Sequence, residues 1–175
     1  FIDDTKEIGT SVISNLKVLE NRKTLVNKLS ERQNYAKENA LILAIGPKNL
    51  AARWDAYLWC KEKKFILPNL IHPDASIDAS ASIGMGNIIL ANATVDYEVS
   101  LGDINYLDIG CLISHNSKIG NNNFLTTGCA TAGNVKFGNH NFVGMHSAFI
   151  DHIEIGDENY FSAKNLITRN ITDKR

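Results

Sequence analysis

Proline, cysteine and long apolar runs are all scarce in this 175-residue chain. Its three cysteines (Cys60, Cys111 and Cys129) cannot all pair with one another, which fits free thiols in a reducing compartment rather than a disulfide framework. The longest apolar runs, such as Ala40–Gly46, are far shorter than the ~18 residues of a membrane-spanning helix, and no export signal is visible. We therefore expect a cytoplasmic protein with no membrane partner.

The chain also lacks an excess of either charge, with a formal net charge of −1. Nucleic-acid binding is therefore not expected, because phosphate contacts need a basic excess. The charge is unevenly spread: residues 1–70 carry 12 basic and 8 acidic side chains, and residues 71–175 carry 6 and 11. We expect two domains that meet near Leu70, and, because Phe1 is not a methionine, a true N-terminus upstream.

Residues 1–70 indicate a small α/β domain. Ala40–Ile45 is a continuous apolar run before Gly46, typical of a strand buried on both faces, and Pro47 suits the first turn of a helix. The expected elements are a strand at Phe1–Asp4, a helix in Leu16–Ser30, a strand at Ala40–Ile45, a helix after Pro47 and a strand at Phe65–Leu67. Together they resemble the later part of a Rossmann-like nucleotide-binding domain that lacks its first strand and glycine turn.

A six-residue period fills residues 71–175. Sixteen of its seventeen first positions are apolar, and Thr131 is the exception. The positions are Ile71, Ile77, Ile83, Ile89, Val95, Leu101, Leu107, Ile113, Ile119, Leu125, Thr131, Phe137, Val143, Phe149, Ile155, Phe161 and Ile167. Small residues, aliphatic residues or asparagines follow four positions later. The pattern predicts a mainly β protein, a parallel β-helix of hexapeptide type.

A stronger period of 18 lies above the hexads. The segments IGMGNI, LGDINY, IGNNNF, FGNHNF and IGDENY start at residues 83, 101, 119, 137 and 155. Three hexads therefore make one coil, and successive coils stack at strand spacing, ~4.8 Å. The recurring asparagines predict a ladder of side-chain amides along the stack, and the recurring glycines predict a bend that disfavours a Cβ.

The third position of each hexad is chemically mixed, so this column is expected to point outward. It contains His115, and also Ile109, Gly133 and Met145. Cys111 and Cys129 instead stand at small core positions one coil apart, so we expect buried, unreactive thiols there.

Three stretches narrow the resemblance to one family: Ile71–Ala75 (IHPDA), Ile113–Gly120 (ISHNSKIG) and Cys129–Val135 (CATAGNV). They resemble the bacterial sugar acyltransferases of the NeuD/PglD type. The resemblance implies a left-handed β-helix and a homotrimer with three sites at subunit boundaries. It also implies transfer of an acetyl group from acetyl-CoA to a nucleotide-linked amino sugar for surface glycans, with no metal.

In this family the histidine that matches His115 is the general base. Histidine suits that role because its ordinary pKa lies near neutrality. Relatives commonly carry Glu or Asp directly after the histidine, whereas Asn116 stands here. We hypothesise that Asn116 orients the imidazole and that Asp108, seven residues before His115, supplies the displaced carboxylate; a solvated turn acid is the alternative for Asp108.

The resemblance also assigns binding residues. Gly133, Met145 and Ala163 match the positions that line the acetyl-CoA groove, and Lys164 is a candidate for a CoA phosphate. Asp3 and Asp4 match the acidic pair that meets the nucleotide of the acceptor, and Gly46 is expected to face the same crevice.

Other functions stay open at this point. The same base would serve a sugar hydroxyl, as in the sialic-acid O-acetyltransferases. A trimeric scaffold without catalysis is a second alternative, because the acid after His115 is missing. A γ-carbonic-anhydrase-like zinc site would need three histidines, and the spacing of His115, His140 and His146 does not match that pattern.

Overall fold

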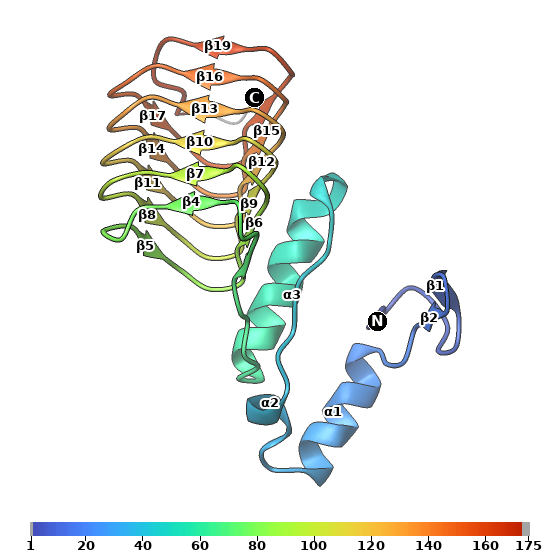
Figure 1. Ribbon diagram of the computed structural model, residues 1–175. Coiled ribbons are helices and arrows are strands. Elements are labelled where there is room, and N and C mark those ends of the chain that lie inside the picture. The colour runs from blue at the N-terminus through green and yellow to red at the C-terminus, as the bar shows by residue number, and fades with distance from the viewer. Residues whose placement is uncertain (1, 173–175) are drawn as a thin grey trace.

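The computed structural model describes residues 2–172. Figure 1 shows two parts: a stack of short strands from residue 70 onward, and a group of helices with a small hairpin beside it. Phe1 of the expected first strand and residues 173–175 lie outside the described residues. Within the described part, no helix is long and apolar enough to cross a membrane.

The first part is helical rather than a sheet. It contains a hairpin of β1 (Ser11–Ile13) and β2 (Leu16–Lys17), then α1 (Arg22–Glu31), α2 (Tyr35–Glu38), the 3-10 turn η1 (Pro47–Asn49) and α3 (Leu50–Glu62). The helix expected after Pro47 is confirmed. The helix expected in Leu16–Ser30 begins only at Arg22, because Asn21 caps it by accepting the Thr24 N–H at 3.0 Å.

The strand expected at Ala40–Ile45 is wrong as a strand buried on both faces. Ala40 makes a single parallel bridge to Ile66, and Ile42 remains 49% exposed. Ile2 makes a similar isolated bridge to Glu20. A strand is buried on both faces only where neighbouring strands and helices cover it. Residues 2–69 provide no such layers, so a Rossmann-like domain is not shown.

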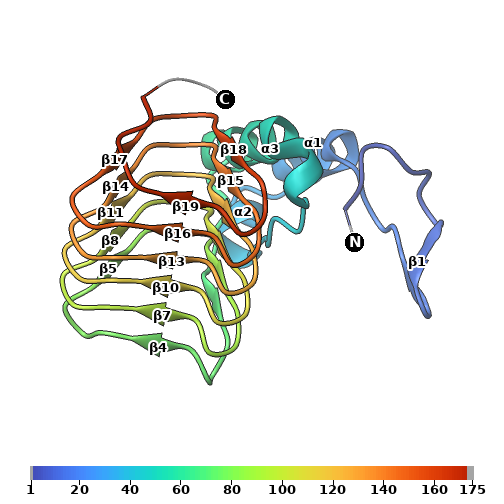
Figure 2. The ribbon, with the colours of Figure 1, turned by 90° about the horizontal axis from the view of Figure 1, so that it is seen from above.

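The second part is a parallel solenoid with three faces, which Figure 2 shows from above. Face 1 consists of β3 (Leu70–Ile71), β6 (Ile88–Ile89), β9 (Tyr106–Leu107), β12 (Phe124–Leu125), β15 (Phe142–Val143) and β18 (Tyr160–Phe161). Face 2 consists of β4 (Ser76–Ile77), β7 (Thr94–Val95), β10 (Leu112–Ile113), β13 (Ala130–Thr131), β16 (Ala148–Phe149) and β19 (Leu166–Ile167). Face 3 consists of β5 (Ser82–Ile83), β8 (Ser100–Leu101), β11 (Lys118–Ile119), β14 (Lys136–Phe137) and β17 (Glu154–Ile155).

The hexad register is confirmed. The second residue of every solenoid strand is the predicted first position of a hexad, and strands pair in parallel at a spacing of 18 residues, as Ile113 does with Val95 and Thr131. From Ile89 onward these residues form one buried core with the small residues of the turns. About five coils therefore share a single apolar interior, whose burial stabilises neighbours rather than lone coils.

The predicted asparagine ladder is present. Asn123 is fully buried; its Oδ1 accepts the main-chain N–H of Asn141 at 3.0 Å, and its Nδ2 donates to the Gly138 carbonyl at 2.9 Å. The same bonds recur one coil apart from Asn87 to Asn159. The glycine column has a different cause from the expected bend: a Cβ on Gly102 would stand 2.6 Å from the Gly120 carbonyl oxygen, so close approach of coils excludes it.

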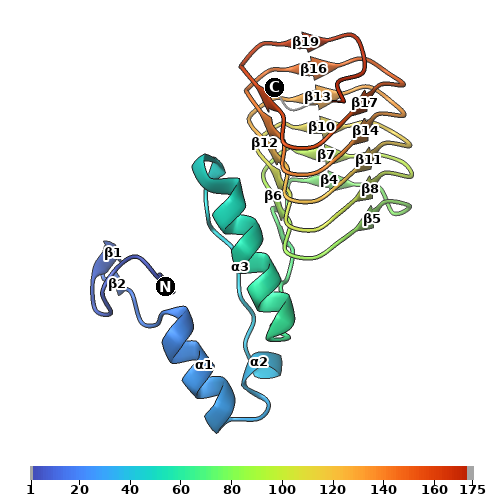
Figure 3. The ribbon, with the colours of Figure 1, turned by 180° about the vertical axis from the view of Figure 1, so that it is seen from behind.

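Helix α3 fastens the first part to the solenoid, as Figure 3 shows from behind. The Trp54 ring packs edge-on against His140 with centroids 4.9 Å apart, and Tyr57 donates its hydroxyl hydrogen to Asp103. Arg53 is fully buried and reaches Asn122 at 3.3 Å. Burial lowers the pKa of Arg53 to about 10, which still leaves it charged at neutral pH.

We expect Asn123→Ala to lower the free energy of unfolding by about 2–3 kcal/mol, because it leaves buried partners without hydrogen bonds. Asn159→Ala is the matched control at the ladder's end, where the Asn159 Oδ1 has no partner among the described residues. Its loss should be less than half as large. Urea unfolding measures both, and equal losses would contradict a ladder that strengthens through its interior rungs.

Candidate active site

The turns between faces form three columns, here called corners. Corner 1 follows the face 1 strands, corner 2 follows face 2, and corner 3 follows face 3. The predicted residues His115, Asn116 and Gly133 come together at corner 2. Corner 1 holds the other four predicted solenoid residues, Asp108, Met145, Ala163 and Lys164. Face 2 separates the two groups within one chain.

His115 lies on the outer surface and packs on the coil above. Its ring covers the backbone of Gly133, where an added Cβ would stand 2.6 Å from Nε2 of His115. Gly133 is itself buried. The predicted outward direction of His115 is therefore confirmed, and the glycine leaves the space that the imidazole fills.

A chain of hydrogen bonds extends from the imidazole to the coil below. Nδ1 of His115 lies 3.0 Å from Oδ1 of Asn116, and Nδ2 of Asn116 donates to Oε2 of Glu98 at 2.8 Å. The Tyr97 hydroxyl donates to the other carboxylate oxygen, Oε1, at 2.8 Å. That bond to Glu98 raises the pKa of Tyr97. The amide thus bridges an imidazole and a carboxylate.

Thr131, the one polar residue in the first-position column, supports the same turn. Its hydroxyl oxygen accepts the main-chain N–H of Ser114 at 3.2 Å, directly before His115. In the other coils of corner 2 the corresponding N–H donates to a main-chain carbonyl, as that of Asp96 does to Ile113. The exception in the core column therefore marks the coil that carries the histidine.

Asp108 does not reach His115 in this chain. Its Oδ2 accepts the hydroxyl hydrogen of Thr127 at 3.0 Å, and its Oδ1 accepts the N–H of Ile109 at 2.8 Å. Both partners belong to corner 1. Met145 is 50% exposed at the same corner, and Ala163 and Lys164 are exposed one coil above it.

The remaining histidines occupy other settings. His140 lies at corner 3 and His146 at corner 1, so the three histidines of the zinc alternative stand on three different corners of one chain. Nδ1 of His140 lies 2.9 Å from Nδ2 of Asn122, and Nδ1 of His72 accepts the N–H of Asp74 at 3.1 Å. Within the described residues, no three His, Cys, Asp or Glu side chains are grouped to hold a metal ion.

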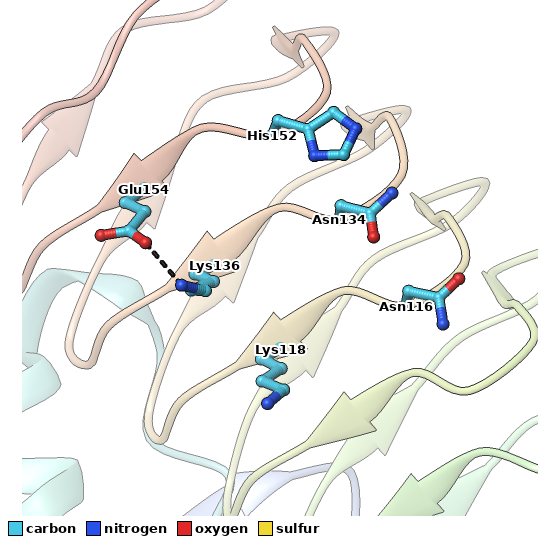
Figure 4. Close-up of a pocket in the computed structure, with 6 residues that line it drawn as sticks. All are labelled: Asn116, Lys118, Asn134, Lys136, His152 and Glu154. Atoms are coloured by element: carbon cyan, nitrogen blue, oxygen red, sulfur yellow. Dashed lines mark hydrogen bonds and ion pairs between the residues drawn. The ribbon is translucent and has the colours of Figure 1, made fainter.

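A shallow groove of about 320 Å³ runs beside corner 2 along face 3, and Figure 4 shows its residues. Its lining consists of Asn116, Asn134 and His152 from the corner and Lys118, Lys136 and Glu154 from the face. Lys136 pairs with Glu154 at 2.5 Å. The groove places amides and cations next to the amide that touches His115.

The predicted nucleotide-binding residues lie in the first part. Oδ1 of Asp3 accepts the N–H and the hydroxyl hydrogen of Thr5 at 2.8 and 2.7 Å. Asp4 forms an ion pair with Arg22, which also pairs with Asp55 of α3 at 2.7 Å. These bonds lower the pKa of Asp3 and, against the opposing effect of burial, that of Asp4. Gly46 is exposed at the start of η1.

Cys111 and Cys129 are fully buried, as expected, one coil apart. Cys111 donates to the Thr126 carbonyl at 3.1 Å, and Cys129 donates to the Gly144 carbonyl at 3.2 Å. The neighbouring Cys129 thiol and burial raise the pKa of Cys111. Cys111 is therefore not a nucleophile of this site.

Sequence reasoning missed Glu98, Tyr97 and the role of Thr131. The signal for Glu98 was present, because it precedes Asn116 by 18 residues and the coil period places such residues directly over one another. The signal for Thr131 was its exception to the apolar column.

No protein-family model matches the sequence, and no curated protein sequence matches it either. Solved structures do. The acetyltransferase domain of PglB from Neisseria gonorrhoeae in complex with acetyl coenzyme A is similar with a TM-score of 0.86 and 25% identity, over 99% of this chain and 79% of that chain. PerB from Caulobacter crescentus in complex with CoA and GDP-perosamine is similar with a TM-score of 0.82 and 25% identity, over 93% and 75%.

A third solved structure is a variant of GDP-perosamine N-acetyl transferase from Caulobacter crescentus with a histidine replaced by alanine. It holds CoA and GDP-perosamine and is similar with a TM-score of 0.84 and 24% identity, over 94% of this chain and 75% of that chain.

We expect Gly133→Ala to displace the His115 ring, because the new methyl group would occupy the space of the imidazole. The Gly133 backbone itself accepts alanine, since its φ lies outside the left-handed region. The side-chain NMR signals of His115 should shift strongly. Gly46→Ala, with open space around its Cβ, is the control that should leave them unchanged. An unmoved ring in Gly133→Ala would contradict the packing.

Proposed function

We propose that this chain, which shares the fold of the hexapeptide-repeat sugar acyltransferases, transfers an acetyl group from acetyl-CoA to the amino group of a nucleotide-linked sugar. The PglB and PerB structures confirm the resemblance seen in the motifs. One observation carries the assignment of the base: His115 is the histidine whose ring packs on a buried glycine while an amide oxygen faces its Nδ1. The proposal includes the left-handed winding and surface-glycan role that the resemblance implies.

The reaction needs a base at the acceptor amine. Nε2 of His115 makes no hydrogen bond within the described residues, whereas Nδ1 faces Asn116. As the amine nitrogen attacks the thioester carbonyl, Nε2 takes its proton; the new C–N bond forms, the C–S bond breaks, and the proton passes to the departing thiolate. General base catalysis of this kind is typically worth roughly 10²–10⁴-fold in rate.

Two corners of one chain supply the residues expected to bind acetyl-CoA. Gly133 lies with His115 at corner 2, whereas Met145, Ala163 and Lys164 lie at corner 1, across face 2. A site that uses both groups forms where corner 2 of one copy meets corner 1 of another. This geometry supports the expected homotrimer, because a cyclic arrangement repeats one such boundary three times.

Face 2 suits contact with another copy. Its outward residues carry no charge: Ser76, Thr94, Leu112, Ala130, Ala148 and Leu166. Leu166 is 67% exposed, and Ile109 and Met145 at the adjoining corner are about half exposed. Face 3 instead presents Lys118, Lys136 and Glu154. Uncharged surface with exposed aliphatic side chains is typical of surfaces that bind a partner.

The acceptor is proposed to be a nucleotide-linked amino sugar, since PerB is solved with GDP-perosamine. Asp3, Asp4 and Gly46 remain the candidates for contact with its nucleotide. Asp3 is the stronger of the two acids, because its Oδ2 has no hydrogen bond within residues 2–172, whereas Arg22 occupies Asp4. A cytoplasmic location is part of the proposal, supported by the three free thiols.

We expect His115→Ala to lower kcat/KM for acetyl transfer by roughly 10²–10⁴-fold while acetyl-CoA affinity is retained, because the base acts only on the acceptor proton. Thiol release from acetyl-CoA measures turnover with UDP-, GDP- and dTDP-linked amino sugars, and calorimetry measures acetyl-CoA binding. His72→Ala is the control.

Full turnover by His115→Ala would overturn the base assignment. Turnover with matched hydroxy sugars in place of the amino sugars would replace N-acetylation by O-acetylation. A wild-type chain that binds no acetyl-CoA and releases no thiol would be the non-catalytic scaffold instead.

We expect co-expressed His115→Ala and Ala163→Trp chains to recover activity that neither has alone. Random assembly leaves about a quarter of the boundaries with both intact corners. Co-expression of His115→Ala with Gly133→Ala is the control, because both changes damage corner 2 and no boundary is intact. Recovery is measured by thiol release. Equal activity in the two mixtures would contradict a shared site.

A further inference from the structure

We propose that Glu98 is a positioning residue of this site: its carboxylate fixes the direction of the Asn116 amide, and that amide holds His115 in the tautomer with the proton on Nδ1. Nε2 is then left unprotonated and available as the base. The inference rests on the proposed acetyl transfer for its kinetic consequence, whereas the tautomer itself is a property of the folded chain.

The direction of the bonds follows from the chemistry of their ends. A carboxylate only accepts hydrogen bonds, so the Asn116 group 2.8 Å from Oε2 of Glu98 must be the amide NH₂. The amide oxygen consequently faces the imidazole, 3.0 Å from Nδ1. An amide oxygen also only accepts, so Nδ1 must carry the hydrogen. Without Glu98 nothing at that end decides which way the amide points.

Glu98 is itself held in place on two sides. Its main-chain N–H donates to the Ser80 hydroxyl oxygen at 2.8 Å, and Tyr97 donates to Oε1 at 2.8 Å. Oε2 is thereby directed at Asn116. Glu98 also has a φ of +52°, a left-handed conformation that is disfavoured for residues other than glycine and asparagine. The turn keeps that conformation at the residue that supplies the carboxylate.

The arrangement explains how the site works without an acid directly after the histidine. The carboxylate stands one coil below, 18 residues before Asn116, and acts through the amide. It takes the role that Asp108 was expected to fill, because Asp108 bonds instead to Thr127 and Ile109 at corner 1. Asn116 has a φ of +59°, which asparagine tolerates better than most residues.

Two other histidines show the opposite arrangement. Nδ1 of His72 accepts the N–H of Asp74, so the hydrogen of the neutral ring must be on Nε2. Nδ1 of His140 faces the amide nitrogen of Asn122, whose Oδ1 accepts from Arg53 at 3.3 Å. His140 therefore also carries its hydrogen on Nε2. The chain thus contains its own references for both tautomers.

The first test is a long-range ¹H–¹⁵N NMR spectrum of the histidine side chains at a pH where the rings are neutral. His115, assigned by its loss in His115→Ala, should show the Nδ1–H pattern, while His72 and His140 show Nε2–H. In Glu98→Ala the His115 pattern should move toward Nε2–H. An Nε2–H pattern for His115 in the wild type, or no change in Glu98→Ala, would overturn the proposal.

The second test is kinetic. Glu98→Ala should lower kcat roughly tenfold, less than the 10²–10⁴-fold expected for removal of the base, with KM for acetyl-CoA unchanged. Adding Asn116→Asp to Glu98→Ala should restore most of the lost kcat, because an acid beside the histidine accepts the Nδ1 hydrogen without needing a partner. A merely structural role for Glu98 would not be rescued in this way.

The two tests separate the two proposals. An Nδ1–H tautomer in a chain that transfers no acetyl group would refute the proposed function alone. Unchanged kcat in Glu98→Ala, or a double variant as slow as Glu98→Ala while Asn116→Asp alone is active, would refute the positioning role alone. If Glu98→Ala does not fold, Glu98→Gln replaces it in both tests, since its amide can offer Asn116 either end and should still weaken the Nδ1–H preference.

Discussion

The whole solenoid depends on one constraint: each coil is joined to the next by parallel main-chain hydrogen bonds, so every side chain lies over the residue 18 positions away. The buried asparagines bond along this direction, and so do the face 1 aromatics, with Tyr106 and Phe124 stacked at 4.2 Å between centroids. The same vertical neighbourhood places Glu98 against Asn116 and His115 over Gly133. Structure and site therefore use one contact rule.

That rule explains what the sequence could predict. A period repeated seventeen times is a strong local signal, and it predicted every solenoid strand and the inward residues of each. Residues 1–70 offer no such repetition. The apolar run at Ala40–Ile45 indicates a strand, yet a sheet needs partners far apart in the chain, and only the bridge to Ile66 forms among the described residues. Periodicity predicts neighbours; a single apolar run does not.

The candidate site shows the same division. His115, Asn116 and Gly133 were predicted together, because the family motifs fall on adjacent coils of one corner. Asp108 was selected by its nearness in the chain, but seven residues in a solenoid lead across a strand and into another corner. A separation of 18 residues leads to direct contact. Glu98 was the better candidate by that measure, and reading the hexads for burial alone passed over it.

Departures from the repeat gather around His115. Thr131 places a hydroxyl in the apolar core, Gly133 leaves space for a ring, and Glu98 holds a left-handed turn conformation. Each is unfavourable when taken alone, since a buried methyl group, a side chain with a Cβ and a relaxed turn would suit the solenoid better. All three act on one imidazole or the turn that carries it. A repeat that is otherwise regular has reason to break its own rules at one corner only where the side chain there must be held in a defined position, and that is what a general base requires.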